Sequence, residues 1–187
     1  MSRIVSGTLG GRRVAMPAGR GTRPTSDRTR EGLFNSLNTL TELEGCRFAD
    51  LYAGSGAVGI EALSRGAVHA LFVESAAKPA RVLRENLAAL GLMSPAEVVV
   101  GSVAKAMASG PGSAPYDVVF ADPPYEMPDA ELSAVLADAV RGGWVASGGL
   151  VVLERSTRAQ PPAWVPGLTG VRSRRYGETT LWYGRAS

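Results

Sequence analysis

The segment from Asp50 to Gly59, Asp-Leu-Tyr-Ala-Gly-Ser-Gly-Ala-Val-Gly, limits the fold more than any other part of the chain. It ends an apolar stretch, residues 48–52, that predicts a strand, and it opens a predicted helix at about residues 58–65. Glycines at a strand-to-helix turn let the backbone bend tightly and approach a ligand closely. The segment therefore predicts a parallel α/β sheet with a ligand site at the carboxyl end of its first strand.

The rest of the chain continues this alternation of strands and helices. We expect further strands at 69–74, 97–100, 116–121 and 149–154, with helices at 79–90 and 129–140. The tail differs, because residues 171–176 and 179–184 predict two strands joined by the turn Gly177-Glu178. The fold class is α/β: a doubly wound, mostly parallel, Rossmann-like sheet of seven strands that ends in an antiparallel hairpin. This is the architecture expected of a class I methyltransferase.

The chain divides into a basic N-terminal arm, residues 1–24, and a main domain, residues 25–187. The arm alternates enough between residues 2 and 14 to hold a short hairpin around Gly10-Gly11. Thr25, Ser26 and Asp27 then offer oxygens that cap a helix N-terminus, and that helix has an apolar face.

Positive charge is concentrated at the start of the chain. Residues 1–30 hold seven arginines and one acid, a pattern that suits phosphate contacts. The candidate RNA-binding residues are Arg12, Arg13, Arg20, Arg23, Arg28 and Arg30. The alternative is a solvated segment in a chain that prefers arginine throughout, since it has 18 arginines and 2 lysines.

Composition restricts the cofactor and the compartment. One histidine and one cysteine, Cys46, argue against a metal site and exclude an internal disulfide. No apolar run reaches the roughly 20 residues that span a bilayer. We therefore expect a cytoplasmic protein without metal or membrane attachment, and a monomer.

The glycine loop and the acid after it predict a nucleotide-like cofactor. Gly54, Gly56 and Gly59 match the spacing of dinucleotide sites, and Glu74 ends the next strand, where a carboxylate can accept both ribose hydroxyls. Tyr52 and Ser55 belong to the same expected site.

Asp50 and Ser102 help to decide which nucleotide-like cofactor binds. A carboxylate at Asp50 would repel a pyrophosphate but attracts the ammonium group of a methionine moiety, which favours S-adenosylmethionine over NAD. Ser102 follows the third strand, where sites of this class often have an acid for the adenine amino group; it either contacts adenine or caps a helix.

The sequence Asp122-Pro123-Pro124-Tyr125 at the end of the fourth strand predicts the catalytic residues. An amino group on a base is a poor nucleophile, because its lone pair is delocalised into the ring. The Asp122 carboxylate and the Pro123 carbonyl can accept its two hydrogens, the prolines stiffen the loop, and Tyr125 can stack on the base. The target base must leave its own stack to reach this site. The plainer alternative is a turn after a buried strand.

A longer motif resembles a known family. The residues Arg23 to Asn35, Arg-Pro-Thr-Ser-Asp-Arg-Thr-Arg-Glu-Gly-Leu-Phe-Asn, look like the N-terminal signature of the RsmD-like family of bacterial 16S ribosomal RNA guanine-N2 methyltransferases, and Tyr176 to Leu181 resembles its tail. The resemblance implies S-adenosylmethionine as methyl donor. It also implies a guanine of 16S rRNA as substrate, presented in the small ribosomal subunit or its assembly intermediate. By the same resemblance, residues 122–125 are catalytic and Asp50, Gly54, Gly56 and Glu74 bind the cofactor, while Ser102 departs from the pattern.

Three other functions remain open at this point. The catalytic motif serves any planar amino group, so an adenine-N6 or glutamine-amide methyltransferase is one alternative. A catalytically idle RNA-binding module is a second, and a dinucleotide-dependent oxidoreductase is the third.

Overall fold

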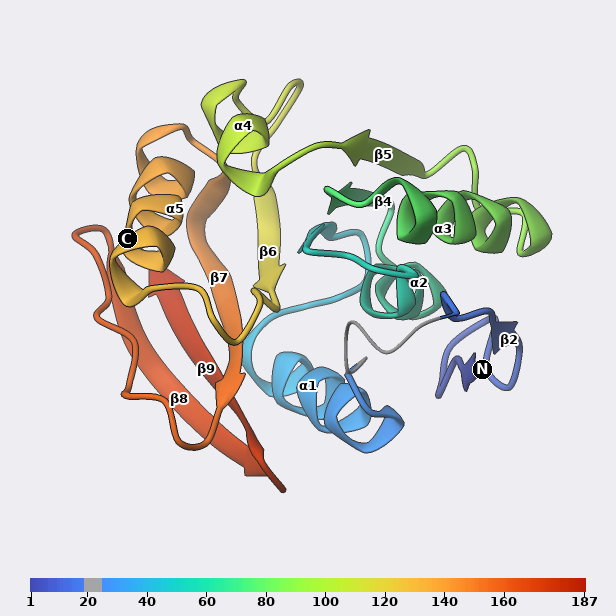
Figure 1. Ribbon diagram of the computed structural model, residues 1–187, viewed down its shortest axis with the longest axis horizontal. Helices are drawn as coiled ribbons and strands as arrows, with labels where there is room; N and C mark the ends of the chain where they lie inside the picture. Colours follow the sequence, from blue (N-terminus) through green and yellow to red (C-terminus); the bar gives the residue numbers. More distant parts are fainter. Residues whose placement is uncertain (19–24) are drawn as a thin grey trace.

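A computed structural model describes residues 1–18 and 25–187 and has a single large sheet with helices on both faces (Figure 1). The sheet has the strand order β5-β4-β3-β6-β7-β9-β8. Its strands are β3 (Arg47–Leu51), β4 (His69–Glu74), β5 (Ala96–Val100), β6 (Tyr116–Ala121), β7 (Val145–Ser156), β8 (Leu168–Tyr176) and β9 (Thr179–Ala186). The helices are α1 (Asp27–Leu40), α2 (Ala57–Ser64), α3 (Ala77–Ala89), α4 (Val103–Ala108) and α5 (Asp129–Arg141).

Strand pairing confirms the predicted fold class. The pairs β3–β4, β4–β5, β3–β6 and β6–β7 are parallel. Strand β9 then pairs antiparallel with both β7 and β8, which forms the predicted C-terminal hairpin. The strand order reverses beside β3, and such a reversal opens a crevice at the carboxyl ends of the strands.

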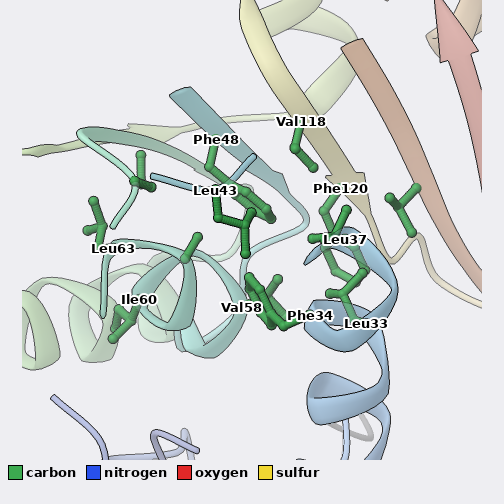
Figure 2. Packing of buried hydrophobic residues seen from close by; sticks show 14 of the residues in the cluster. Leu33, Phe34, Leu37, Leu43, Phe48, Val58, Ile60, Leu63, Val118 and Phe120 are labelled. Carbon is green, nitrogen blue, oxygen red and sulfur yellow. The ribbon is translucent and has the colours of Figure 1, made fainter. Parts of the chain in front are cut away.

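Two apolar clusters pack against the two faces of the sheet. The first joins the sheet to α1, α2 and α3, and Figure 2 shows Leu33, Phe34 and Leu37 of α1 near Phe120 of β6. The second cluster joins the other face to α4 and α5. Because parallel strands buried on both faces must be apolar throughout, the near-continuous runs in β4, β6 and β7 follow from this arrangement.

The start of α1 is capped as its sequence predicts. The Ser26 hydroxyl accepts a hydrogen bond from the Thr29 N–H at 3.1 Å, and Asp27 supplies an acid in the first turn. Residues Leu33, Phe34 and Leu37 are buried on one side of the helix. The cap fixes where α1 begins, beside the ends of the central strands (Figure 1).

The N-terminal segment forms a short hairpin that packs onto the main sheet's helices. Strands β1 (Ser2–Arg3) and β2 (Arg13–Val14) pair antiparallel, and Ile4 and Val14 are buried in the first apolar cluster. The Ala15 N–H donates to the Asn86 side chain of α3 at 2.9 Å. Residues 1–18 therefore share their core with the rest of the fold.

The structure differs from the sequence prediction mainly at one helix and at the starts of two strands, one of which is β8, which begins at Leu168 instead of Val171. Helix α4 was not predicted, because six residues are too few to show helical periodicity. Strand β7 begins at Val145 instead of Gly149, since its pairing with β6 shifts register between Tyr116 and Val118 and Gly148 takes a positive φ of 72°. In the described residues, no helix is long and apolar enough to cross a membrane.

Candidate active site

The loop after β3 takes a backbone conformation that most residues avoid. Gly54 and Gly56 have φ values of 56° and 84°, and a Cβ at Gly56 would collide with the Leu83 side chain. Tyr52 has φ 63°, which is rare for a residue with a bulky side chain and costs conformational energy. Strain of this kind gathers at ligand sites, because it places backbone groups where ordinary turns do not.

The Glu74 carboxylate is fixed in place at the end of β4. Its two oxygens accept hydrogen bonds from the Gly54 N–H and the Ala76 N–H, both at 2.8 Å. Each carboxylate oxygen has a further lone pair, so the group can still accept hydroxyl donors from a ligand. The predicted acceptor for a ribose thus lies against the predicted glycine loop.

A cavity of about 110 Å³ opens beside this loop. Tyr52 and Glu74 line it with Ser102 and Met127, and the Tyr52 hydroxyl lies 3.8 Å from the Met127 sulfur. Ser102 caps α4 by accepting from the Lys105 N–H at 3.2 Å, as one of its two predicted roles requires. Its exposed position on the cavity wall leaves the adenine contact a prediction.

Two predicted cofactor residues lie deeper in the structure. One Asp50 oxygen accepts from the Gly59 N–H at 2.9 Å, which ties β3 to α2. Burial raises the pKa of Asp50 to about 8, although that hydrogen bond opposes the rise. The Ser55 hydroxyl is buried and contacts the Met16 sulfur at 3.3 Å, and the Ser55 carbonyl accepts from Asn86. Their contacts with a cofactor stay predictions.

The Asp122–Tyr125 segment leaves the sheet directly after β6. The Asp122 N–H donates to the Leu51 carbonyl at 3.5 Å, so this segment lies next to the end of β3. Pro123 is buried and Pro124 is exposed, while Tyr125 keeps 59% of its surface accessible. An exposed tyrosine at a strand end is available to stack on a base.

A second carboxylate, missed at the sequence level, lies beside Asp122. Ala121 of β6 pairs with Leu153 of β7, and the next residues are Asp122 and Glu154. Glu154 is only 6% exposed, and its Oε2 accepts a hydrogen bond from the Thr25 hydroxyl at 2.8 Å. Burial and then the Glu154 charge raise the pKa of Asp122 well above its usual range. Burial likewise raises the pKa of Glu154.

Glu154 opens onto a second cavity, of about 150 Å³. The start of α1, Tyr125 at the end of the Asp122–Tyr125 segment, and the β8–β9 turn form its walls, with Arg28 and Tyr176 among the lining residues. Tyr125 lines this cavity, and Met127, two residues later, lines the first one. One loop therefore separates two cavities at the carboxyl edge of the sheet.

Comparison with known proteins identifies the family. Residues 2–185 match the family described as Conserved hypothetical protein 95. The chain is 34% identical to YlbH of Bacillus subtilis over 178 residues, 95% of each protein. It is 38% identical to the Ribosomal RNA small subunit methyltransferase D of Escherichia coli over 152 residues, 81% of this chain and 73% of that protein.

The chain belongs to the RsmD-like family. Solved structures agree, since YhhF of Escherichia coli superposes with a TM-score of 0.84 and 31% identity over 99% of this chain and 97% of the other.

The arginines of this RsmD-like chain have unequal surroundings. Arg12, Arg13 and Arg28 are exposed, so their predicted RNA contacts stay open, whereas Arg20 and Arg23 lie outside the described residues.

Arg30 requires a correction, because it is 1% exposed. It donates to Glu61 at 3.3 Å, to the Ser2 hydroxyl at 3.1 Å, to Asp27 at 3.1 Å and to the Arg3 carbonyl. With its donors engaged inside the protein, Arg30 is a structural residue and not a phosphate contact.

Acidic residues at the site are not arranged for a metal. In residues 1–18 and 25–187, no group of three or more His, Cys, Asp or Glu side chains could hold a metal ion.

Glu154 had a signal in the sequence, because it is an acid at the end of the predicted strand 149–154. Its position beside Asp122, however, depends on the order of the strands in the sheet.

Proposed function

We propose that this chain transfers a methyl group from S-adenosylmethionine to the N2 amino group of a guanine in 16S rRNA. The substrate is the small subunit or its assembly intermediate, and the enzyme acts as a cytoplasmic monomer. The Escherichia coli relative is named as a small-subunit rRNA methyltransferase, and this name supports rRNA of the small subunit as the substrate.

One observation carries the proposal: the loop with Asp122 borders both cavities. Its Met127 faces the cavity with Glu74, and its Tyr125 faces the cavity with Glu154. A methyl transfer needs the donor on one side and the acceptor on the other, held in line at short range. The arrangement favours a transferase with two substrate sites over an idle RNA-binding module.

The residues of the first cavity and of the glycine loop beside it fit S-adenosylmethionine. Gly54 has open space where a Cβ would lie, so a ligand can approach its backbone. The fixed Glu74 carboxylate suits the two ribose hydroxyls. Asp50 supports the loop from behind by accepting a hydrogen bond from the Gly59 N–H.

The catalytic segment supplies acceptors for the amino group. When bound, S-adenosylmethionine would supply a methyl group from its sulfonium, and the electron pair of the carbon–sulfur bond would stay on sulfur. Asp122 and the Pro123 carbonyl accept the two amino hydrogens and hold the nitrogen lone pair toward the methyl group. As the nitrogen gains the methyl group it becomes positive, and Asp122 takes the proton it releases. The raised pKa of Asp122 makes this carboxylate a suitable proton acceptor.

Mass spectrometry of rRNA nucleosides tests the reaction. A strain that lacks the gene should lose one N2-methylguanine from 16S rRNA, and restoring the gene should return it. Purified protein should methylate small subunits from that strain better than naked 16S rRNA. An unchanged nucleoside profile, or loss of a methylated adenine instead, would contradict the proposal.

Calorimetry tests the cofactor separately. S-adenosylhomocysteine should bind and NADH should not. Glu74→Ala should weaken S-adenosylhomocysteine binding at least tenfold, because two hydroxyls lose a charged acceptor worth about 1.5–3 kcal/mol. An equal dissociation constant in the variant would remove Glu74 from the site.

A further inference from the structure

Glu154 and Asp122 lie side by side at the end of the sheet. Asp122 follows Ala121 and Glu154 follows Leu153, and these two preceding residues are paired in neighbouring parallel strands. Such strands are about 4.8 Å apart. Ala121 and Leu153 both face the second apolar cluster, so by strand alternation the two carboxylates are directed to the opposite face, where α1 begins.

The residues that the structure describes, 1–18 and 25–187, give Glu154 little compensation for its burial. Within the described residues, its hydrogen-bond partner is the Thr25 hydroxyl, and no arginine or lysine forms an ion pair with it. Burial of a carboxylate is costly, and a second carboxylate at Asp122 adds repulsion. The methyl transfer described above does not use Glu154. A ligand that brings hydrogen-bond donors would relieve this cost.

The cavity beside Glu154 has the walls that a base needs. Tyr125 comes from the catalytic segment, Tyr176 from the end of β8, and Arg28 from the first turn of α1. Tyrosine rings offer stacking surfaces, and an exposed arginine at the rim suits the phosphate of an extruded nucleotide. The Glu154 carboxylate is the charged acceptor of this cavity that lies next to Asp122.

The pair of carboxylates matches one base better than the others. Guanine has the N1–H donor directly beside its N2 amino group, so its edge offers three hydrogens in a row. Glu154, Asp122 and the Pro123 carbonyl are three acceptors. Adenine and cytosine instead have an acceptor nitrogen beside the amino group, and its lone pair would face the Glu154 carboxylate.

We propose that the cavity between α1, the Asp122–Tyr125 segment and the β8–β9 turn receives the target guanine, and that the Glu154 carboxylate selects it by accepting its N1–H. This inference rests on the proposed guanine-N2 methylation and names the residue responsible for base selection. Glu154 is thus a specificity-determining residue that contacts the substrate base, beside the catalytic Asp122.

Substitution of Glu154 combined with a modified base tests the inference. The substrates are small subunits reconstituted with 16S rRNA that has either guanine or 2-aminopurine at the position methylated in the cell. The 2-aminopurine base keeps the amino group but has an acceptor at N1. Wild-type protein should prefer guanine, and Glu154→Gln should lower kcat/KM for guanine by about 10- to 100-fold, the effect of losing a hydrogen bond to a charged group. Because the glutamine amide can donate, the same variant should act on 2-aminopurine better than the wild type does.

Two further measurements and one control variant separate the outcomes. Glu154→Gln should keep its melting temperature and its affinity for S-adenosylhomocysteine, and Glu85→Gln, an exposed acid of α3, should match the wild type throughout. If Glu154→Gln lowers both rates equally and keeps the wild-type preference, or changes neither, base selection by Glu154 is wrong while guanine methylation stands. If the wild-type protein does not methylate guanine at all, the proposed function itself fails.

Discussion

At the scale of single residues, Asp122 has the most direct chemical role. Asp122→Ala should lower the single-turnover rate by about 10²–10³, because the nitrogen loses an acceptor as it becomes positive. Asp122→Asn should be milder, since its amide oxygen still accepts a hydrogen. Affinity for S-adenosylhomocysteine should change little, because the residues proposed to hold the cofactor are Glu74 and the glycine loop. Transfer of tritiated methyl groups to small subunits measures the rate, and an alanine variant with more than about a tenth of wild-type activity would make Asp122 a turn residue only.

Asp50 should make stability depend on pH. Burial raises its pKa to about 8, so the folded chain keeps a proton that the unfolded chain loses above about pH 4. The free energy of unfolding contributed by this group therefore falls as pH rises from about 4 to 8. Asp50→Asn keeps an oxygen for the Gly59 N–H and removes the titration. Urea unfolding should show the variant gaining stability relative to wild type between pH 5 and pH 8.5, and a constant difference would contradict the assignment.

At the scale of elements, α1 depends on a buried ion pair. Arg30 joins α1 to Glu61 of α2, which is fully buried and also accepts from the Val5 and Ser6 N–H groups. Arg30→Met should lower the free energy of unfolding by about 3–5 kcal/mol, because it leaves a buried charge with fewer partners. Asp27→Asn changes an exposed partner of the same guanidinium and should cost about 1 kcal/mol or less. Chemical denaturation compares the two, and equal losses would mean that the Glu61 contact is not the important one.

Elements with strong local signals could be predicted from the sequence. Helix α1 has its Ser26 cap. Between β3 and α2, the glycines at positive φ mark a tight strand-to-helix turn. Helix α4 has no comparable signal, because Val103 to Ala108 spans less than two turns.

Side-chain environments were harder to predict than elements. Arg30 resembles its exposed neighbour Arg28 in sequence, yet its burial depends on Glu61 of another helix. Glu154 matters because β7 lies beside β6, and strand order is a property of the whole chain. Asp122 and Glu74 were predictable because they end strands next to recognisable loops.

At the scale of the whole molecule, the site lies at one edge of the sheet and the basic hairpin packs on α2 and α3 (Figure 1). The hairpin contacts Ser64 at the end of α2, and the chain then runs past Asn86 of α3 to Ser55 of the glycine loop, which Met16 contacts. A large RNA substrate that inserts one base must also rest on the surrounding surface. Residues 15–18, which follow the hairpin and reach the glycine loop, are placed to be part of that surface.

Because the hairpin has exposed arginines, RNA affinity should depend on it while cofactor affinity does not. Arg12 and Arg13 are exposed, and removing one arginine–phosphate interaction should flatten the plot of log affinity against log salt by about 0.7–0.9. Arg12→Gln with Arg13→Gln should flatten the slope by up to twice that amount. Arg141→Gln is the matched control, because Arg141 ends α5, which packs on the opposite face of the sheet from the hairpin, and its side chain is 74% exposed. Titration of 16S rRNA fragments at several salt concentrations, with calorimetry of S-adenosylhomocysteine alongside, measures both affinities. A slope that is unchanged in the double variant, or flattened equally in Arg141→Gln, would mean that the hairpin does not bind phosphates.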